Sequence, residues 1–223
     1  MTTKLAWPRA TLTLLAAATL LTSLSACAPL VVGGLATTAV MATDRRTSGT
    51  QLEDEGIELR AANRLRETLG ERGHINITSY NRQALLTGEV PTEADKQRAE
   101  QVLAGVDNVK SVVNELAVLG NSSFSQRSSD VLITGRVKAS IADAQDLSMH
   151  AFKVVTERGT VYLMGRVTER EATRVAQVAR HVPGVQRVVR VLEVISEAEL
   201  ARLQPQPAPA NASAVPASRD AGN

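Results

Sequence analysis

The stretch Gln-Ala-Leu-Leu-Thr-Gly-Glu-Val at residues 83–90 returns in related form at residues 160–167, as Thr-Val-Tyr-Leu-Met-Gly-Arg-Val, 77 positions further on. A valine-rich segment downstream repeats as well, with residues 106–118 matching residues 182–194 at an offset of 76. Because the two copies share both spacing and periodicity, the sequence predicts a duplicated domain. Two copies are too few for a solenoid.

Each copy has the pattern helix, strand, strand, helix, strand. Apolar residues at every fourth position predict the first helix, and short β-rich runs joined by two turn residues predict a hairpin. In the first copy we expect a helix over 52–69 with Thr50 and Glu53 as its capping box, strands over 75–80 and 84–90, a helix capped by Thr92, and a strand over 109–119. In the second copy we expect a helix capped by Asp130, strands over 152–156 and 161–167, a helix opened by Thr168 and Glu171, and a strand over 187–195.

The beginning of the chain has the layout of a secretory leader. Two basic residues precede an apolar run over residues 10–24, and small residues lead directly to Cys27. This order predicts a signal peptide over residues 1–26, because the run is shorter than the ~20 residues that a membrane-spanning helix needs. Cys27 is the only cysteine, so no intramolecular disulfide can form.

The tetrapeptide Leu24-Ser25-Ala26-Cys27 resembles the lipobox of bacterial lipoproteins. The resemblance implies that Cys27 becomes the mature N-terminus and carries a thioether-linked diacylglycerol and an N-acyl chain, which together hold a protein on a bilayer. Ala28 follows, where lipoproteins kept at the inner membrane often carry Asp, so the resemblance implies anchoring in the outer membrane, facing the periplasm. An ordinary signal peptide with an incidental cysteine is the alternative.

Composition divides the rest of the chain. Small polar residues in the linker predict a hinge or loose packing between the domains, and the Pro/Ala-rich end predicts disorder. The uncharged start of the tether either lies along the bilayer or is a flexible leash. The expected parts are the signal peptide 1–26, the lipidated N-terminus and tether 27–50, the first domain 51–119, the linker 120–129, the second domain 130–196 and the disordered tail 197–223.

The motif Leu-x-Gly-x-Val occurs at Leu86–Val90 and again at Leu163–Val167, each time followed by an amphipathic helix and a Val-rich strand. This pattern resembles the BON domain, and two such domains behind a lipobox resemble dual-BON outer-membrane lipoproteins. The resemblance implies an α+β fold of two tandem BON domains, each αββαβ with a small mixed three-stranded sheet packed by two helices. It also implies non-enzymatic binding of anionic phospholipid, chiefly by the second domain, and a role in outer-membrane integrity.

Residues that converge on a chemical reaction are missing from the sequence. His74, His150 and His181 share no metal-ligand spacing, and neither HExxH, GxSxG nor a P-loop occurs. The chain has one Trp, two Tyr and two Phe, too few for base stacking, and a formal net charge of only +2. We therefore expect no enzyme, no cofactor, no metal site and no nucleic-acid partner, and we interpret the histidines as surface or loop-end residues.

Charge is distributed unequally over the two copies. Residues 51–119 contain 8 basic and 12 acidic side chains, whereas residues 131–196 contain 10 basic and 6 acidic ones. Each basic residue near an anionic bilayer contributes about 1 kcal/mol, so the second domain is the one suited to anionic lipid. The alternative, which is compatible with the first, is that the two domains attract each other.

The first helix of the second domain is the expected lipid contact. At about 100° per residue, Ile133, Val137 and Ile141 face the sheet, and an apolar strip flanked by cations remains on the far side. The resemblance points to the same helix, although Leu132 stands where the similar lipoproteins carry a tryptophan. The predicted lipid-binding residues are Val131, Leu132, Gly135, Arg136, Lys138, Ala139 and Ala142.

Two alternatives remain open. Val131 and Leu132 would lie in the first helical turn, where they could instead staple the linker. The corresponding helix of the first domain is predicted to be charged on its outer face, through Arg60, Arg64 and Glu67. An acidic first domain would also suit a protein-interaction scaffold, for instance an accessory of outer-membrane-protein assembly with envelope proteins as partners.

Overall fold

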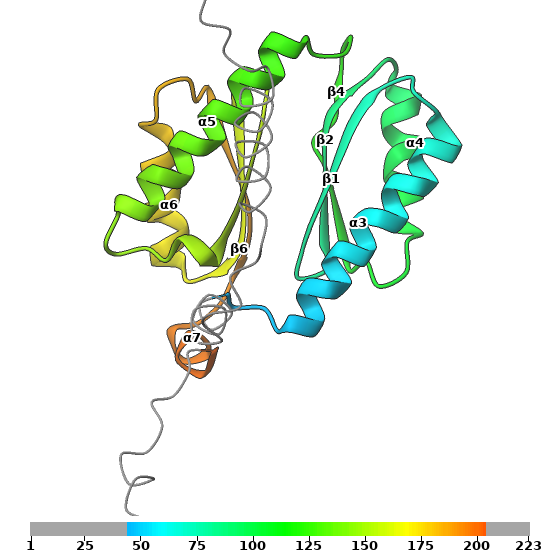
Figure 1. Ribbon diagram of the computed structural model, residues 1–223. Helices are drawn as coiled ribbons and strands as arrows, with labels where there is room; N and C mark the ends of the chain where they lie inside the picture. Colours follow the sequence, from blue (N-terminus) through cyan, green and yellow to red (C-terminus); the bar gives the residue numbers. More distant parts are fainter. Residues whose placement is uncertain (1–43, 204–223) are drawn as a thin grey trace, which may run out of the picture. The chain divides into compact units, whose positions relative to one another are not determined.

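The computed structural model describes residues 44–203 and shows two αββαβ units in tandem (Figure 1). The first domain consists of α3 (Ser48–Leu69), β1 (His74–Tyr80), β2 (Gln83–Val90), α4 (Glu93–Ala104), β3 (Ser111–Asn114) and β4 (Ala117–Val118). The second consists of α5 (Phe124–Asp143), the short 3₁₀ helix η2 (Met149–Ala151), β5 (Phe152–Glu157), β6 (Thr160–Val167), α6 (Glu169–Arg180) and β7 (Arg187–Val194). Helix α7 (Glu197–Leu203) follows the second domain.

Both sheets are mixed, as predicted. In each, an antiparallel hairpin (β1–β2 or β5–β6) is joined by a parallel closing strand that pairs with the second hairpin strand. The expected single strand over 109–119 is wrong, because the first sheet contains β3 and a fourth, short strand β4, both paired with β2. The Asn114 side chain accepts a hydrogen bond from the backbone N–H of Leu116 (3.2 Å), and this local bond interrupts the ladder.

The hairpin turns have two residues each, both in the left-handed region. Their φ angles are 51° and 67° at Asn81 and Arg82, and 50° and 72° at Arg158 and Gly159. Turns of this kind match the right-handed twist of the flanking strands. The two-residue hairpins predicted from the sequence are confirmed.

A buried aspartate on the first helix of each domain holds its hairpin turn. Asp54 accepts the backbone N–H groups of Asn81 and Arg82, and Asp130 accepts those of Arg158 and Gly159 (2.7–2.8 Å). The prediction that Asp130 caps a helix is therefore wrong. It lies one and a half turns inside α5, where its carboxylate satisfies two turn donors that would otherwise be buried without partners.

Helix starts account for most other differences. Ser123 caps α5 by accepting the N–H of Gln126, so residues 124–129 are helical and not linker. Thr47 caps α3, and the predicted capping box at Thr50 is wrong. The capping box of Thr168 and Glu171 is confirmed.

The two ends of the described range are more ordered than predicted. Arg45 pairs with Glu171 of α6 (2.7 Å), and Arg46 pairs with Asp54 (2.8 Å), so this end of the tether is held by both domains. Residues 197–203 form α7 instead of belonging to a disordered tail, and Leu200 is buried. The predictions for residues 1–43 and 204–223, including lipidation of Cys27, lie outside the described residues.

The core of each domain lies between one sheet and its two helices (Figure 1). The predicted stripe on α3 is buried, and so is the stripe on α5, with Ile133, Val137 and Ile141 at most 8% exposed. Strand β2 is buried on both faces, since Leu86 belongs to this core while Leu85 points to the other side.

The sheet faces that the helices leave uncovered contact each other across the two domains. Their shared apolar cluster consists of Tyr80, Leu85, Tyr162, Met164 and Val191. The expected loose packing is therefore wrong, because the two domains share an apolar cluster. The polar composition of the linker does not predict how the sheets on either side of it pack.

Candidate membrane-binding surface

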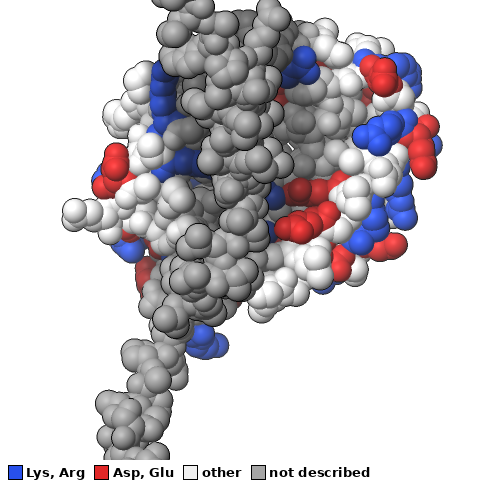
Figure 2. All heavy atoms as spheres, viewed as in Figure 1, with Lys and Arg blue, Asp and Glu red and all other residues white. Residues whose placement is uncertain are grey.

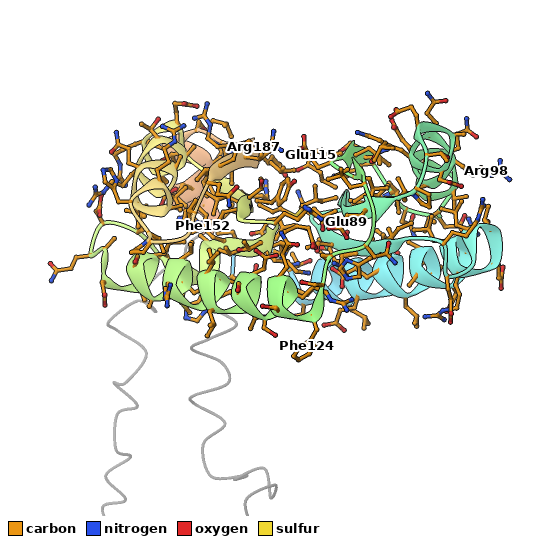
Figure 3. All side chains as sticks on the ribbon, turned by 90° about the horizontal axis from the view of Figure 1, so that it is seen from above. Glu89, Arg98, Glu115, Phe124, Phe152 and Arg187 are labelled. Carbon is orange, nitrogen blue, oxygen red and sulfur yellow. The ribbon has the colours of Figure 1, made fainter. Side chains whose placement is uncertain are left out.

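Among the large apolar side chains of the second domain, those on the outer face of α5 are the most exposed. Phe124, Val131 and Leu132 are 81%, 70% and 61% exposed. Phe124 and Val131 are seven residues apart, so they lie on one line along the helix, opposite the buried stripe. Figure 3 shows Phe124 at the start of α5, pointing away from the domain.

All predicted lipid-binding residues lie on this helix and are exposed. Gly135, Ala139 and Ala142 continue the line of Val131, and Arg136 and Lys138 flank it. Val131 and Leu132 lie two turns after the start of α5, not in its first turn. Because both side chains are exposed, the alternative that they staple the linker is wrong.

Phe124 and Arg127 belong to the same surface and were missed in the sequence. Both fall in the stretch interpreted as linker, because Asp130 looked like the helix start. The sequence signal for the true helix start is Ser123, which is as good a cap as Asp130. Ser123 directly precedes Phe124, an apolar residue two helical turns before Val131. The exposed strip is two turns longer than predicted.

The charge on this face is mainly positive. Arg127, Arg136 and Lys138 are exposed and form no ion pair with any residue between 44 and 203. Helix α5 contains two carboxylates, Asp130, which is buried, and Asp143, which is exposed at its last position. The surface thus offers three cations and one acid, at the C-terminal end of the helix.

The corresponding face of α3 is different. Leu52 and Leu59 are 71% and 65% exposed, so the prediction of a purely charged face is wrong in part. Their neighbours on that face are Glu55 and Arg66, which break up the apolar surface. Figure 2 shows acidic and basic side chains interspersed over the first domain.

Part of the unequal charge is used between the domains. Lys153 and Arg158 of the second domain pair with Glu58 and Glu89 of the first, at 2.7 and 3.0 Å. Arg187 reaches Glu115 at 2.8 Å, and Figure 3 shows the two side chains turned toward each other. Mutual attraction of the domains, left open above, is therefore confirmed, and the cations of α5 take no part in it among residues 44–203.

One polar cluster with metal-ligand spacing occurs among residues 44–203, formed by His74, Glu89 and Glu157. Burial disfavours the charged form of Glu89, but hydrogen bonds from Arg158, the Ser122 backbone and His74 outweigh it and lower its pKa. Burial raises the pKa of Glu157 despite the hydrogen bond from Asn76. His74 is thus not the surface residue expected from its place before a strand. The side chains of the other two histidines are not part of this cluster.

Comparison with known proteins agrees with the geometry. The BON-domain profile matches residues 53–120 and 129–196, more than half of the chain. The chain belongs to the BON-domain family. It is 36% identical over 174 residues to outer membrane lipoprotein DolP of Haemophilus influenzae, covering 77% of this chain and 90% of that protein. It is therefore a dual BON-domain protein similar to DolP.

A second relative is the 21 kDa hemolysin of Actinobacillus pleuropneumoniae, 34% identical over 68% of this chain and 79% of that protein. Among solved structures, the C-terminal domain of CdsD from the type III secretion system of Chlamydia trachomatis aligns with 60% of this chain and 96% of its own, at 11% identity and a TM-score of 0.27. That likeness is too low to bear on the BON fold. Within residues 44–203, no helix combines the length and the apolar character needed to cross a bilayer.

Proposed function

We propose that this protein is an outer-membrane lipoprotein, anchored through Cys27 and facing the periplasm, which binds anionic phospholipid with the outer face of α5. The observation that carries the proposal is the exposed strip of Phe124, Val131 and Leu132 beside three cations. Apolar side chains enter the interface between headgroups and acyl chains, while Arg and Lys attract the anionic headgroups. The relationship to outer membrane lipoprotein DolP supports the outer-membrane location. The cellular role in this proposal is to support outer-membrane integrity.

The buried stripe of α5 leaves the outer strip free to insert. Ile133, Val137 and Ile141 are fixed in the core, so the helix need not move or unfold to present Val131 and Leu132. A rigid surface loses little conformational entropy on binding. The acyl anchor keeps the protein at the membrane, and α5 then adds selectivity for headgroup charge.

The test compares two double variants of the chain from residue 28 to 223, which lacks the acylated cysteine. Leu132→Glu with Arg136→Glu changes the α5 surface, and Leu59→Glu with Arg66→Glu makes the same chemical change on α3. At about 1 kcal/mol per unit of charge, the α5 variant is expected to bind vesicles containing phosphatidylglycerol about 100-fold more weakly at low salt. The α3 variant is expected to bind within about threefold of wild type.

Melting temperature is the control, because all four positions are exposed and should affect stability little. Binding is measured at low salt and at ~0.15 M, since screening weakens the charge contribution. If the α5 variant melts normally and binds as tightly as wild type at both salts, α5 is not the lipid site.

The anchor has its own test. Cys27→Ser is expected to leave an uncleaved or soluble precursor, because serine cannot accept the thioether-linked lipid. Membrane fractionation and acyl labelling measure this, and an acylated, membrane-bound Cys27→Ser protein would refute the assignment.

A second candidate function is a protein-docking scaffold that uses the first BON domain. The observation in its favour is the exposed pair Leu52 and Leu59 on a domain with 8 basic and 12 acidic side chains, whose net negative charge anionic lipid would repel. An envelope protein, such as a component of outer-membrane-protein assembly, is the partner expected there. Loss of a cross-linked envelope partner in the α3 variant alone would favour this function for the first domain.

A further inference from the structure

The cluster of His74, Glu89 and Glu157 joins the two domains at a point that neither lipid binding nor the apolar contact explains. His74 begins β1, Glu89 lies near the end of β2, and Glu157 ends β5 in the other domain. Their side chains are 20%, 0% and 8% exposed. Carboxylates this deeply buried require compensation. Glu89 has it from Arg158, whereas Glu157 accepts from the neutral side chain of Asn76, so the burial of Glu157 has a cost that a cation can offset.

The ligand-type atoms have the spacing of a small cation site. His74 Nδ1 lies 3.2 Å from Glu89 Oε2 and 3.9 Å from Glu157 Oε1, and all three atoms lie within 4.8 Å of one another. Nitrogen and oxygen ligands about 2.1 Å from a tetrahedral ion are roughly 3.4 Å apart. The observed separations bracket that value.

Each carboxylate is oriented by a donor on its other oxygen. Arg158 donates to Glu89 Oε1 and Asn76 donates to Glu157 Oε2, both at 3.0 Å, which leaves the remaining oxygens directed at His74. Donors that fix the ligands from behind are characteristic of metal sites. The Ser122 backbone N–H also donates to Glu89 Oε2 (3.2 Å), and its buried hydroxyl has no hydrogen-bond partner within residues 44–203.

The backbone places His74 closely against β2. Gly88 has φ of 109°, and a Cβ there would lie 1.9 Å from the His74 carbonyl oxygen and 3.5 Å from its Nδ1. Only glycine permits this approach. A cavity of about 280 Å³, lined by His74, Asn76 and Glu157 and on the side of α5 by Arg127 and Val131, opens beside the cluster.

We propose that His74, Glu89 and Glu157 form a divalent-cation site that ties the first BON domain to the second. One imidazole and two carboxylates suit zinc, whereas calcium and magnesium take oxygen ligands and larger or octahedral shells. A fourth position remains for water. Because Glu157 comes from the second domain, the bound ion cross-links β1 and β2 to β5.

The experiment titrates zinc chloride into the full chain, purified from membranes in detergent, by calorimetry and elemental analysis. We expect one zinc per chain and a higher melting temperature with zinc than with calcium or magnesium. His74→Asn and Glu157→Gln are each expected to weaken zinc binding more than 100-fold and to abolish the thermal shift. His150→Asn, at an exposed histidine, is the matched control and should bind as wild type.

Asn76→Ala keeps the test decisive if a ligand variant folds poorly. Asn76 is exposed and holds Glu157 without being a ligand itself, so its loss is expected to weaken zinc binding about tenfold. Absence of saturable zinc binding by wild type, or equal affinity in wild type, His74→Asn and Glu157→Gln, would overturn the proposal. Neither outcome depends on lipid binding by α5.

Discussion

The two BON domains have the same fold but opposite residues at equivalent positions. Glu89 on β2 corresponds to Arg166 on β6, 77 residues later. Glu89 is fully buried and binds Arg158 across the domain contact, whereas Arg166 binds Glu193 and Glu199 on its own side. The charge at this position therefore serves the contact between the domains in the first copy and a contact within the second domain and α7 in the second copy.

The same comparison applies to the first helices. Their buried stripes are alike because each must cover a sheet of the same shape. Their outer faces differ, with charges between Leu52 and Leu59 on α3 and small residues beside Val131 on α5. The two domains therefore differ most on the helix faces that packing against the sheet leaves unconstrained.

The largest expected difference between the domains concerns the turn-holding aspartates. Asp54 receives four hydrogen bonds and Asp130 receives two. Replacing either with Ala leaves buried donors without partners, at about 1–3 kcal/mol for each unsatisfied group. We expect a loss of about 4 kcal/mol for Asp54→Ala and about 2 kcal/mol for Asp130→Ala in urea unfolding. Asp143→Ala, at the exposed end of α5, is the control, and equal losses at Asp54 and Asp130 would contradict the ranking.

The motif glycines are expected to differ in the same direction. A Cβ at Gly88 would meet the His74 carbonyl oxygen at 1.9 Å with φ of 109°, and one at Gly165 would meet that of Ala151 at 2.4 Å. Gly88→Ala combines a clash with backbone strain and should cost about 3 kcal/mol, against about 2 kcal/mol for Gly165→Ala.

Gly135→Ala provides a control of opposite sign for these two variants. A Cβ at Gly135 meets nothing within 4 Å inside α5, so alanine should raise stability by up to about 1 kcal/mol. Thermal melts measure all three. Destabilisation by Gly135→Ala would show that the outer face of α5 is not as open as the structure has it.

Acid should weaken the second domain through Glu171. Burial opposes its charge, but hydrogen bonds from Arg45 and the Thr168 backbone outweigh burial and lower the pKa. A folded pKa below the unfolded value of about 4.3 means that this stabilisation is full above pH 4.3 and is lost as pH falls through the folded pKa.

The expected loss is on the order of 1 kcal/mol, the size of a capping interaction. Unfolding of wild type and Glu171→Gln is followed from pH 6 to pH 3, and the variant should lose less stability over that range. Parallel pH curves for the two proteins would show that Glu171 does not carry the effect.

The smallest expected effect is at the edge of the domain contact. Arg187 and Glu115 form an ion pair whose side chains are 59% and 28% exposed. Exposed pairs contribute about 0–1 kcal/mol, so Arg187→Ala should change stability by less than 1 kcal/mol. A double-mutant cycle with Glu115→Ala isolates the pair. A coupling above about 2 kcal/mol would mean that charge, and not the apolar cluster, holds the domains together.

Local patterns predicted most of the fold because they report which face of an element is buried. The stripe on α3, both two-residue hairpins and the capping box at Thr168 all follow from spacing and residue type within a few positions. The start of α5 was wrong because Asp130 and Ser123 are both good caps. Only the hairpin turn, 28 residues away from Asp130, shows which of them is used as one.

The packing of the domains has a signal in the sequence of the strands. Leu85-Leu86 and the run Val161–Met164 are continuously apolar, as strands buried on both faces are. The polar composition of the linker predicts looseness, but linker composition reflects only local flexibility.

The sequence by itself determined the duplication, the αββαβ order, the family and most of the exposed apolar strip on α5, because each depends on periodicity or on a short motif. Only the tertiary structure decided which charges meet across the domains, and it alone brought His74, Glu89 and Glu157 together. Those three residues lie on three strands and 15 and 68 positions apart in the chain. Strand register and the contact between two sheets set their distances, and no local pattern records either.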